Sequence, residues 1–169
     1  MIRKLRTVAL LLTGPAALSL SLAASGPAAA ATARPDARPA PLACTTAVPI
    51  ELNGFAFAPP EVTPGNSATA DLITTNCTAS TLATDEQWTG QWLSPTGTGL
   101  PAGCPAIDPL LRPVTYTPGQ ELAENTTYLV PTGCQAAELA VTVQIFDSTG
   151  TTVLTATTDL KIEQITSGN

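Results

Sequence analysis

The stretch EQWTGQW, which runs from Glu86 to Trp92, holds both tryptophans of a chain that has only seven aromatic residues. On a β-strand, residues four apart lie on the same face, so the indoles of Trp88 and Trp92 are expected about 13 Å apart on one side. Two such rings with Gly90 between them could stack on the sugar rings of a polysaccharide. A small sandwich, however, must bury one face of each strand, and large side chains are scarce here. We therefore predict that the tryptophan face belongs to the core, and we keep Trp92 as the candidate for binding.

The sequence lacks the residue combinations that enzymes commonly use for catalysis. The chain has no histidine, which excludes Ser-His-Asp and Cys-His pairs and metals held by imidazole. Two carboxylates could hydrolyse a glycoside, but nothing in the spacing of the acids selects a pair, and Asp85 and Glu86 are expected in a solvated turn. No calcium-loop motif occurs either. We expect a non-catalytic protein without cofactor or metal, and a small extracellular hydrolase is the weakest of the alternatives.

The cysteines indicate disulfides. The chain carries four of them, with no C-x-x-C pair, and an even number in an exported chain is typical of a disulfide framework. Four cysteines allow three connectivities. If the first two β-rich runs form a hairpin, Cys44 and Cys77 lie at strand ends that meet. This favours Cys44–Cys77 and leaves Cys104–Cys134, each contributing roughly 3–4 kcal/mol in the chain-entropy account.

The N-terminus is typical of a secretory signal. A basic head, MIRKLR, precedes an apolar run and then small residues in A-x-A spacing, and Gly14 and Pro15 interrupt a run that is short for a membrane span. We therefore predict a secreted or surface-associated protein with no stable membrane insertion once the signal is removed. The expected divisions are a signal peptide at 1–31, a flexible Pro- and Ala-rich segment at 32–43, one domain at 44–165 and a tail at 166–169.

The charge of the expected domain excludes one class of partner. From Cys44 onward only Arg112 and Lys161 stand against twelve acids, which gives a net charge of −10. Binding to phosphate backbones or anionic lipids depends on lysine and arginine, so we exclude nucleic acid. The simplest reason for the acidity is solubility outside the cell.

The most irregular segment is Pro95–Pro113, which contains five prolines and through which we expect no β-ladder to run. A long loop of this kind is either functional or a crossover that is tied down. As a functional loop, it would present an extended segment near a disulfide, as secreted protease inhibitors do. Leu110, Leu111 and Arg112 are the side chains that a protease would read.

The rest of the chain alternates short β-rich runs with turn signals. Val48, Ile50 and Leu52 alternate with Pro49 and Glu51 until Gly54, where a bulge is expected. In SATADLITTN, the residues Ala68, Ala70 and Leu72 share a face. Two further short strands are expected around Pro118–Gly119. The clearest pair is ELAVTVQIF and TTVLTATTDLKI, joined by DSTG with Gly150 in the left-handed conformation.

This succession resembles the immunoglobulin-like and fibronectin-type-III-like β-sandwiches of exported bacterial proteins. The resemblance rests on PGNSATADLITTN, TPGQEL and ELAVTVQIFDSTGTTVLTA, and it covers most of Val48 to Ile162. It implies a single all-β, antiparallel sandwich of about seven strands, and it implies no particular chemistry. The function that we favour is a binding or interaction module for an unknown protein or for a cell-wall or extracellular polysaccharide. A protease inhibitor that uses the Pro95–Pro113 loop is the second alternative.

Overall fold

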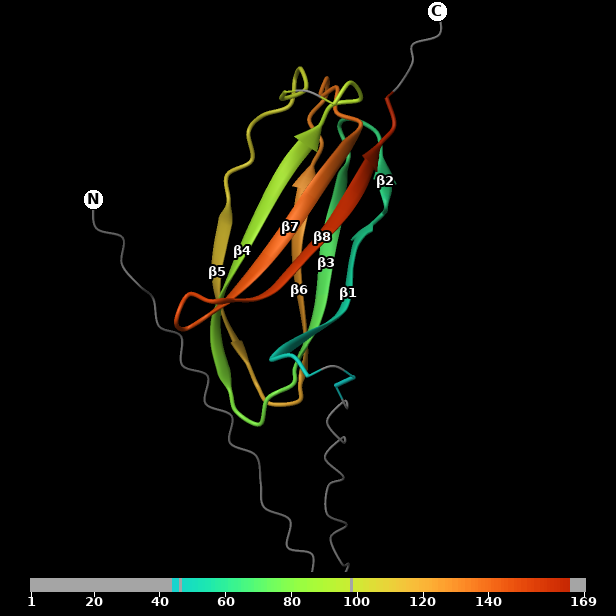
Figure 1. The fold of residues 1–169 in the computed structure, drawn as a ribbon. Helices are drawn as coiled ribbons and strands as arrows, with labels where there is room; N and C mark the ends of the chain where they lie inside the picture. The colour runs from blue at the N-terminus through green and yellow to red at the C-terminus, as the bar shows by residue number, and fades with distance from the viewer. Residues whose placement is uncertain (1–43, 46, 98, 165–169) are drawn as a thin grey trace, which may run out of the picture. The chain divides into compact units, whose positions relative to one another are not determined.

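The computed structural model describes residues 44–45, 47–97 and 99–164. The expected signal peptide, Pro- and Ala-rich segment and C-terminal tail lie outside the described residues. Those residues form eight strands and no helix, so they contain no helix that could cross a membrane. In chain order the strands are β1 (Ile50–Ala58), β2 (Glu61–Val62), β3 (Ser67–Asn76), β4 (Leu82–Leu93), β5 (Leu110–Tyr116), β6 (Glu121–Leu129), β7 (Glu138–Asp147) and β8 (Thr152–Ile162) (Figure 1).

The strands form two sheets that face one another in a sandwich. One sheet has the order β1-β3-β6 and the other the order β2-β8-β7-β4-β5. Every pairing is antiparallel except that of β2 with β8. The predicted all-β sandwich is therefore confirmed. The strand count differs from the expected seven or so because of β2, a two-residue strand whose partner lies about a hundred residues further along the chain, beyond the reach of a local pattern.

The first two β-rich runs do form a hairpin. β1 pairs with β3, and the register slips between Leu52 and Gly54, which is the predicted bulge. Ala68, Ala70 and Leu72 are all buried, as their alternation predicted. Leu52 is exposed although Ile50 is buried. The segment between the two strands is more than the expected turn, because it passes to the edge of the other sheet and forms β2 there.

The second predicted hairpin, β7 and β8, lies within the five-stranded sheet. Its turn places Gly150 at a φ of 82°, in the left-handed region. Four alternating side chains of β7 are completely buried, namely Leu139, Val141, Val143 and Ile145. The outward side chains of the same strand are only partly buried, so β7 follows the period of two that the sequence shows.

The strands β5 and β6 flank the Pro118–Gly119 turn but do not pair with each other. β5 pairs with β4 in one sheet and β6 pairs with β3 in the other, so this turn carries the chain across the sandwich. The expectation that no ladder enters Pro95–Pro113 is wrong for its last four residues. β5 begins at Leu110, and Pro113 pairs with Asp85. A proline is tolerated there because β5 is an edge strand with a partner on one side only.

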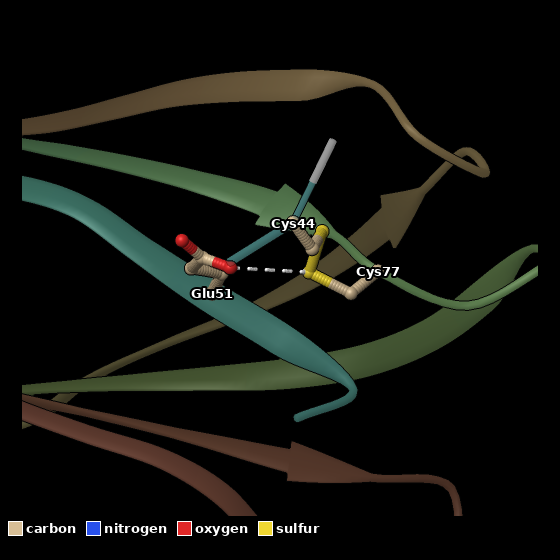
Figure 2. A group of neighbouring side chains, drawn as sticks. All are labelled: Cys44, Glu51 and Cys77. Atoms are coloured by element: carbon tan, nitrogen blue, oxygen red, sulfur yellow. Dashed lines mark hydrogen bonds between the residues drawn. A yellow bond between two sulfur atoms is a disulfide. The ribbon is translucent and has the colours of Figure 1, made fainter. Parts of the chain in front are cut away.

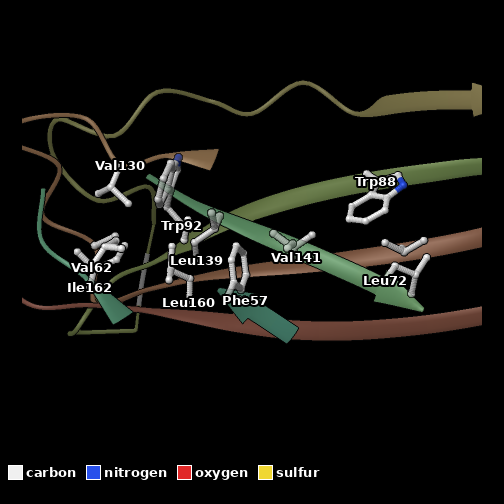
Figure 3. Close-up of a cluster of buried hydrophobic side chains, with 14 of the residues drawn as sticks. Phe57, Val62, Leu72, Trp88, Trp92, Val130, Leu139, Val141, Leu160 and Ile162 are labelled. Atoms are coloured by element: carbon white, nitrogen blue, oxygen red, sulfur yellow. The ribbon is translucent and has the colours of Figure 1, made fainter. Parts of the chain in front are cut away.

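The core lies between the sheets, and both tryptophans are part of it (Figure 3). Trp88 is 1% exposed and Trp92 is 4% exposed, which confirms that the tryptophan face of β4 is the buried face. Phe55 packs its ring against that of Trp88 in an edge-to-face arrangement, with 5.7 Å between the centroids. The two indoles therefore fill the interior of the sandwich and form no external platform.

Candidate functional site

The Pro95–Pro113 loop is fastened onto the tryptophan strand at two points. Ile107 packs over Gly90, where a Cβ would lie only 2.8 Å from its Cδ1 atom. Beside it, the Nε1–H group of Trp92 donates a hydrogen bond of 2.8 Å to the carbonyl oxygen of Pro105. Gly90 thus leaves the space that the side chain of Ile107 fills. Trp92, the candidate binding residue, uses its polar atom to hold that loop in place.

A third fastening ties the loop to the chain between β6 and β7. The disulfide Cys104–Cys134 joins them, and its cysteines are 6% and 0% exposed. Next to it the two backbones meet so closely that a Cβ on Gly103 would lie 2.3 Å from the carbonyl oxygen of Gly133. Gly103 has a φ of 73°, which also favours glycine. These contacts show a crossover that is held down along its second half.

The first half of the loop borders an open groove. The cavity has a volume of about 660 Å³ and lies at the end of β4, where the chain leaves the five-stranded sheet. Leu93, Leu100 and Ala137 supply apolar surface, and Glu138 supplies a carboxylate. The other lining residues are Gln91, Trp92, Ser94, Pro95, Gly97 and Gly99. Leu100 is 62% exposed, so the groove presents an apolar side chain to solvent.

The candidate protease-reading residues do not form a free loop. Leu110 and Leu111 are 39% and 62% exposed, but both lie in the ladder between β5 and β4. Arg112 turns inward, and its guanidinium carbon lies 5.4 Å from the ring centroid of Trp88. The structure therefore separates the four candidate residues. Trp92 lies in the core, the two leucines lie on an edge strand, and Arg112 lies between the sheets.

Arg112 links the edge strands of the two sheets. From β5 it donates hydrogen bonds of 2.8 Å to the carbonyl oxygen of Asn125 and 2.9 Å to Oγ1 of Thr126, both on β6. The carboxylate of Glu124 lies 3.9 Å away, and both side chains are about 30% exposed. An ion pair that open to water contributes little, so the two hydrogen bonds and the contact with Trp88 are the main restraints.

The polar residue that sequence reasoning missed is Glu86. It was expected in a solvated turn, but it lies within β4 and is 0% exposed. The hydroxyl of Tyr116 donates to Oε1 at 2.5 Å, and Nε1–H of Trp88 donates to Oε2 at 3.1 Å. Burial, together with the hydrogen bond to Glu86, raises the pKa of Tyr116. The sequence does contain a signal for this burial. Glu86 is two residues from Trp88, so on a strand both side chains lie on the same face.

The hydrogen bonds of Glu86 with Tyr116 and Trp88 hold the core together and do not form a reactive site. Thr74 completes this network with a hydrogen bond of 3.4 Å from its hydroxyl to the Tyr116 oxygen. Among the described residues, no buried side-chain nitrogen or oxygen lacks a hydrogen-bond partner. Because Glu86 is fully enclosed and both of its oxygens accept hydrogen bonds, it has no contact with solvent through which it could act on a substrate.

A second cluster of potential ligands lies at the start of β1. The disulfide Cys44–Cys77 and the carboxylate of Glu51 lie together there, with their ligand atoms within 4.8 Å of one another (Figure 2). The chain thus has the disulfide pairing that the sequence favours, Cys44–Cys77 and Cys104–Cys134. Sulfurs joined in a disulfide carry no thiolate charge, so in this state the cluster offers the carboxylate of Glu51 but no thiolate ligand.

Comparisons with known proteins do not assign the chain to a family. No family model matches the chain, and no curated protein matches it. Among solved structures it is similar to the Pseudomonas fluorescens alkylpurine DNA glycosylase AlkC, with 8% identity over 70% of this chain and a TM-score of 0.50. The chain spans about a third of that protein, 31% of its length. At this identity the likeness shows the fold alone.

Two smaller proteins match at lower scores. One is a Niemann-Pick type C2 protein from the Japanese carpenter ant, with 10% identity, 72% of this chain and 97% of that chain covered, and a TM-score of 0.42. The other is a CARDB domain from Pyrococcus furiosus crystallised with di-metal ions, with 15% identity, 68% and 85% coverage and a TM-score of 0.44. None of these comparisons assigns the chain to a family, and the β-sandwich is established by its own strand pairing.

Proposed function

We propose that this chain is an exported, non-catalytic binding module that contacts a partner protein through the groove beside Leu93 and Leu100. The observation that carries the proposal is the groove itself, a concave surface lined by both apolar and polar residues. Two disulfides support export, since such bonds persist in oxidising compartments. The absence of histidine and the enclosure of Glu86 support a role without catalysis.

A protein partner is favoured over a polysaccharide by the position of the aromatic rings. Binding to sugar polymers by stacking needs exposed rings. The structure describes all seven aromatic side chains; four of them are buried, and Phe55, Tyr128 and Phe146 are only partly exposed. Trp92 in particular faces the core and is bonded to Pro105. Protein interfaces, by contrast, are built around apolar centres with polar rims, and the groove combines apolar residues such as Leu93 and Leu100 with the carboxylate of Glu138.

The protease-inhibitor alternative is weakened because Arg112, one of its candidate residues, is not free to enter a protease. A protease that reads Arg112 would have to break its hydrogen bonds to β6 and remove it from Trp88. Leu110 and Leu111 keep part of their surface free, but they are held in a ladder with β4. A panel of secreted serine proteases tests this alternative directly, and we expect no inhibition at micromolar protein.

The proposal is tested by blocking the groove without disturbing the fold. Leu100→Arg places a bulky charge at the groove, and Leu129→Arg is the matched control, because Leu129 is equally exposed but lies on β6 of the other sheet. Immobilised wild-type domain is incubated with proteins secreted by the producing cells, and with insoluble polysaccharides in parallel. We expect one retained protein that Leu100→Arg loses and Leu129→Arg keeps. Retention on polysaccharide that neither variant lowers would contradict the proposal.

A further inference from the structure

We propose that the groove at the end of β4 binds an extended segment of the partner protein through a lysine or arginine whose charge pairs with Glu138. The inference rests on the proposed function, because it names the chemistry of the partner that occupies the same groove. Glu138 is the one ionisable side chain among the described residues that line the groove, and Leu93 and Leu100 lie in the same lining. The groove therefore combines apolar surface with a single negative charge.

The sheet places the carboxylate of Glu138 beside an apolar side chain. β4 ends and β7 begins at the same end of the five-stranded sheet, and there Leu93 lies opposite Glu138 (Figure 1). The N–H group of Ala137 donates a hydrogen bond of 2.8 Å to the carbonyl oxygen of Leu93, which fixes this end of the ladder. Residues opposite one another in an antiparallel pair share a face, with Cβ atoms about 5 Å apart. A lysine or arginine can lay its aliphatic stem on the leucine and extend its charged end to the carboxylate.

The charge of Glu138 is not neutralised within the described part of the chain. There its carboxylate accepts no hydrogen bond and makes no ion pair. Lys161 of β8 lies opposite Glu138, but it also lies opposite Glu61 of β2, and it makes no ion pair with either of them. Asp159, two residues before Lys161, lies on the same face. Three acids thus surround one exposed cation at this edge, and negative charge is left for a partner to pair with.

The charge of the whole domain favours the same kind of partner. From Cys44 onward two cations stand against twelve acids. A field of this sign draws a cationic segment toward the surface and repels an acidic one. The field alone would hold a cation anywhere on the domain, so the apolar residues of the groove are needed to give the segment a definite place. A volume of about 660 Å³ is large enough for a few side chains.

A second copy of the described domain does not supply such a segment. Its cations are Arg112 and Lys161. Arg112 is held by two hydrogen bonds to β6, and Lys161 lies within the ladder of β8 with β7 and β2. The occupant is therefore a different protein, in which a lysine or arginine stands close to an apolar residue in an extended stretch.

The probe is a phage-displayed library of random heptapeptides, selected on the immobilised full-length exported chain. We expect the enriched peptides to carry lysine or arginine within two positions of an apolar residue. A parallel selection uses Leu100→Ser, which removes apolar surface from the groove without adding charge, and we expect the same peptides not to be enriched there. Synthetic peptides of the enriched sequences then give affinities by fluorescence anisotropy.

Glu138→Gln should weaken binding of these peptides about tenfold, the usual scale for a lost hydrogen bond to a charged group. Replacing the cation of the peptide by glutamine should cost the same, and both changes together should cost no more than either one. Asp71→Asn is the matched control, because it removes the same charge from the exposed face of the other sheet, and it should change the affinity less than about twofold. Glu138→Gln breaks no side-chain hydrogen bond of the described chain, so its urea midpoint should equal that of the wild type.

Equal losses for Glu138→Gln and Asp71→Asn would overturn the proposal, since they would show attraction to the domain as a whole. Enriched peptides without a cation that still need Leu100 would also contradict it, and the groove would remain the interface. If no enriched peptide depends on Leu100, the groove does not bind protein segments, and the proposed function fails together with the inference. A synthetic peptide of residues 32–43 that binds as tightly as the selected ones would assign the groove to the chain's own N-terminal segment and so overturn the proposal of a separate partner.

Discussion

The side chain of Ile107 occupies the space that a side chain at Gly90 would need. A Cβ at Gly90 would lie 2.8 Å from Cδ1 and 3.2 Å from Cγ2 of Ile107, and 3.5 Å from Cδ1 of Leu139. This contact explains why a glycine stands between the two tryptophans. The residue between them is small because the Pro95–Pro113 loop inserts Ile107 there, and the loop thereby covers the buried face of β4.

Gly90→Ala should destabilise the domain, because the added methyl group forces Ile107 to move. We expect a loss of about 1–3 kcal/mol, the usual cost of overpacking, measured by urea unfolding followed through tryptophan fluorescence. Gly54→Ala is the control, since the nearest atom to its Cβ would be 3.9 Å away. Ile107→Val removes the closest contact, so in combination with Gly90→Ala it should recover part of the loss. Strict additivity of the two changes would mean that the residues do not interact.

Glu86→Gln should destabilise the domain although it preserves the shape of the side chain. The carboxylate accepts from both Tyr116 and Trp88, whereas an amide offers one acceptor oxygen and an NH₂ group that faces donors. Leaving buried groups unsatisfied costs about 1–3 kcal/mol. The control is Asp85→Asn on the exposed face of the same strand, where we expect a change within about 0.5 kcal/mol. Equal unfolding midpoints for the two variants would show that the Glu86 hydrogen bonds do not stabilise the fold.

Alkaline pH should weaken the domain through its two tyrosines. Burial raises the pKa of both Tyr116 and Tyr128. In the unfolded chain they ionise near pH 10, so above that pH the folded state binds more protons and stability falls as pH rises. Below pH 10 this contribution is fully present. Phenolate absorbance should therefore appear together with unfolding. A native protein that shows two ionised tyrosines near pH 10, with its tryptophan fluorescence unchanged, would be inconsistent with this.

Arg112→Lys should loosen the link between β5 and β6. An ammonium group cannot make both hydrogen bonds in the same fork geometry or lie flat on Trp88, so charge alone does not restore the contacts. We expect a loss of about 1 kcal/mol, the net value of such bonds at a partly exposed site. Lys161→Ala, at the other cation of the domain, is exposed and should change stability by less than about 0.5 kcal/mol. An unfolding midpoint for Arg112→Lys equal to that of the wild type would show that the guanidinium is not needed.

The parts of the fold that the sequence predicts are those set by local alternation. The hairpin of β7 and β8, the bulge at Gly54 and the burial of both tryptophans each follow from residues a few positions apart. The hairpin of β1 and β3 also brings Cys44 beside Cys77, so one disulfide follows from topology alone.

The parts that it does not predict depend on partners that are distant in sequence. Glu86 is buried because Tyr116, thirty residues later, supplies a hydroxyl to it, and composition alone assigns an acid to solvent. Pro113 enters a ladder because β5 is at an edge, a fact about sheet order that the sequence around it does not contain. The groove arises where the loop passes the end of β4, and no motif marks it.

The disulfide at the start of the domain has a mechanical consequence. Cys44 precedes β1, and its partner Cys77 follows β3, the central strand of the three-stranded sheet. A pull on the chain ahead of Cys44 therefore reaches β3 through the sulfur–sulfur bond and does not act on β1 alone. To extend, the sheet would have to shear β3 away from two neighbours at once instead of peeling an edge strand one residue pair at a time. Tension applied from the N-terminal side therefore loads this sheet in shear, the direction in which it resists most strongly.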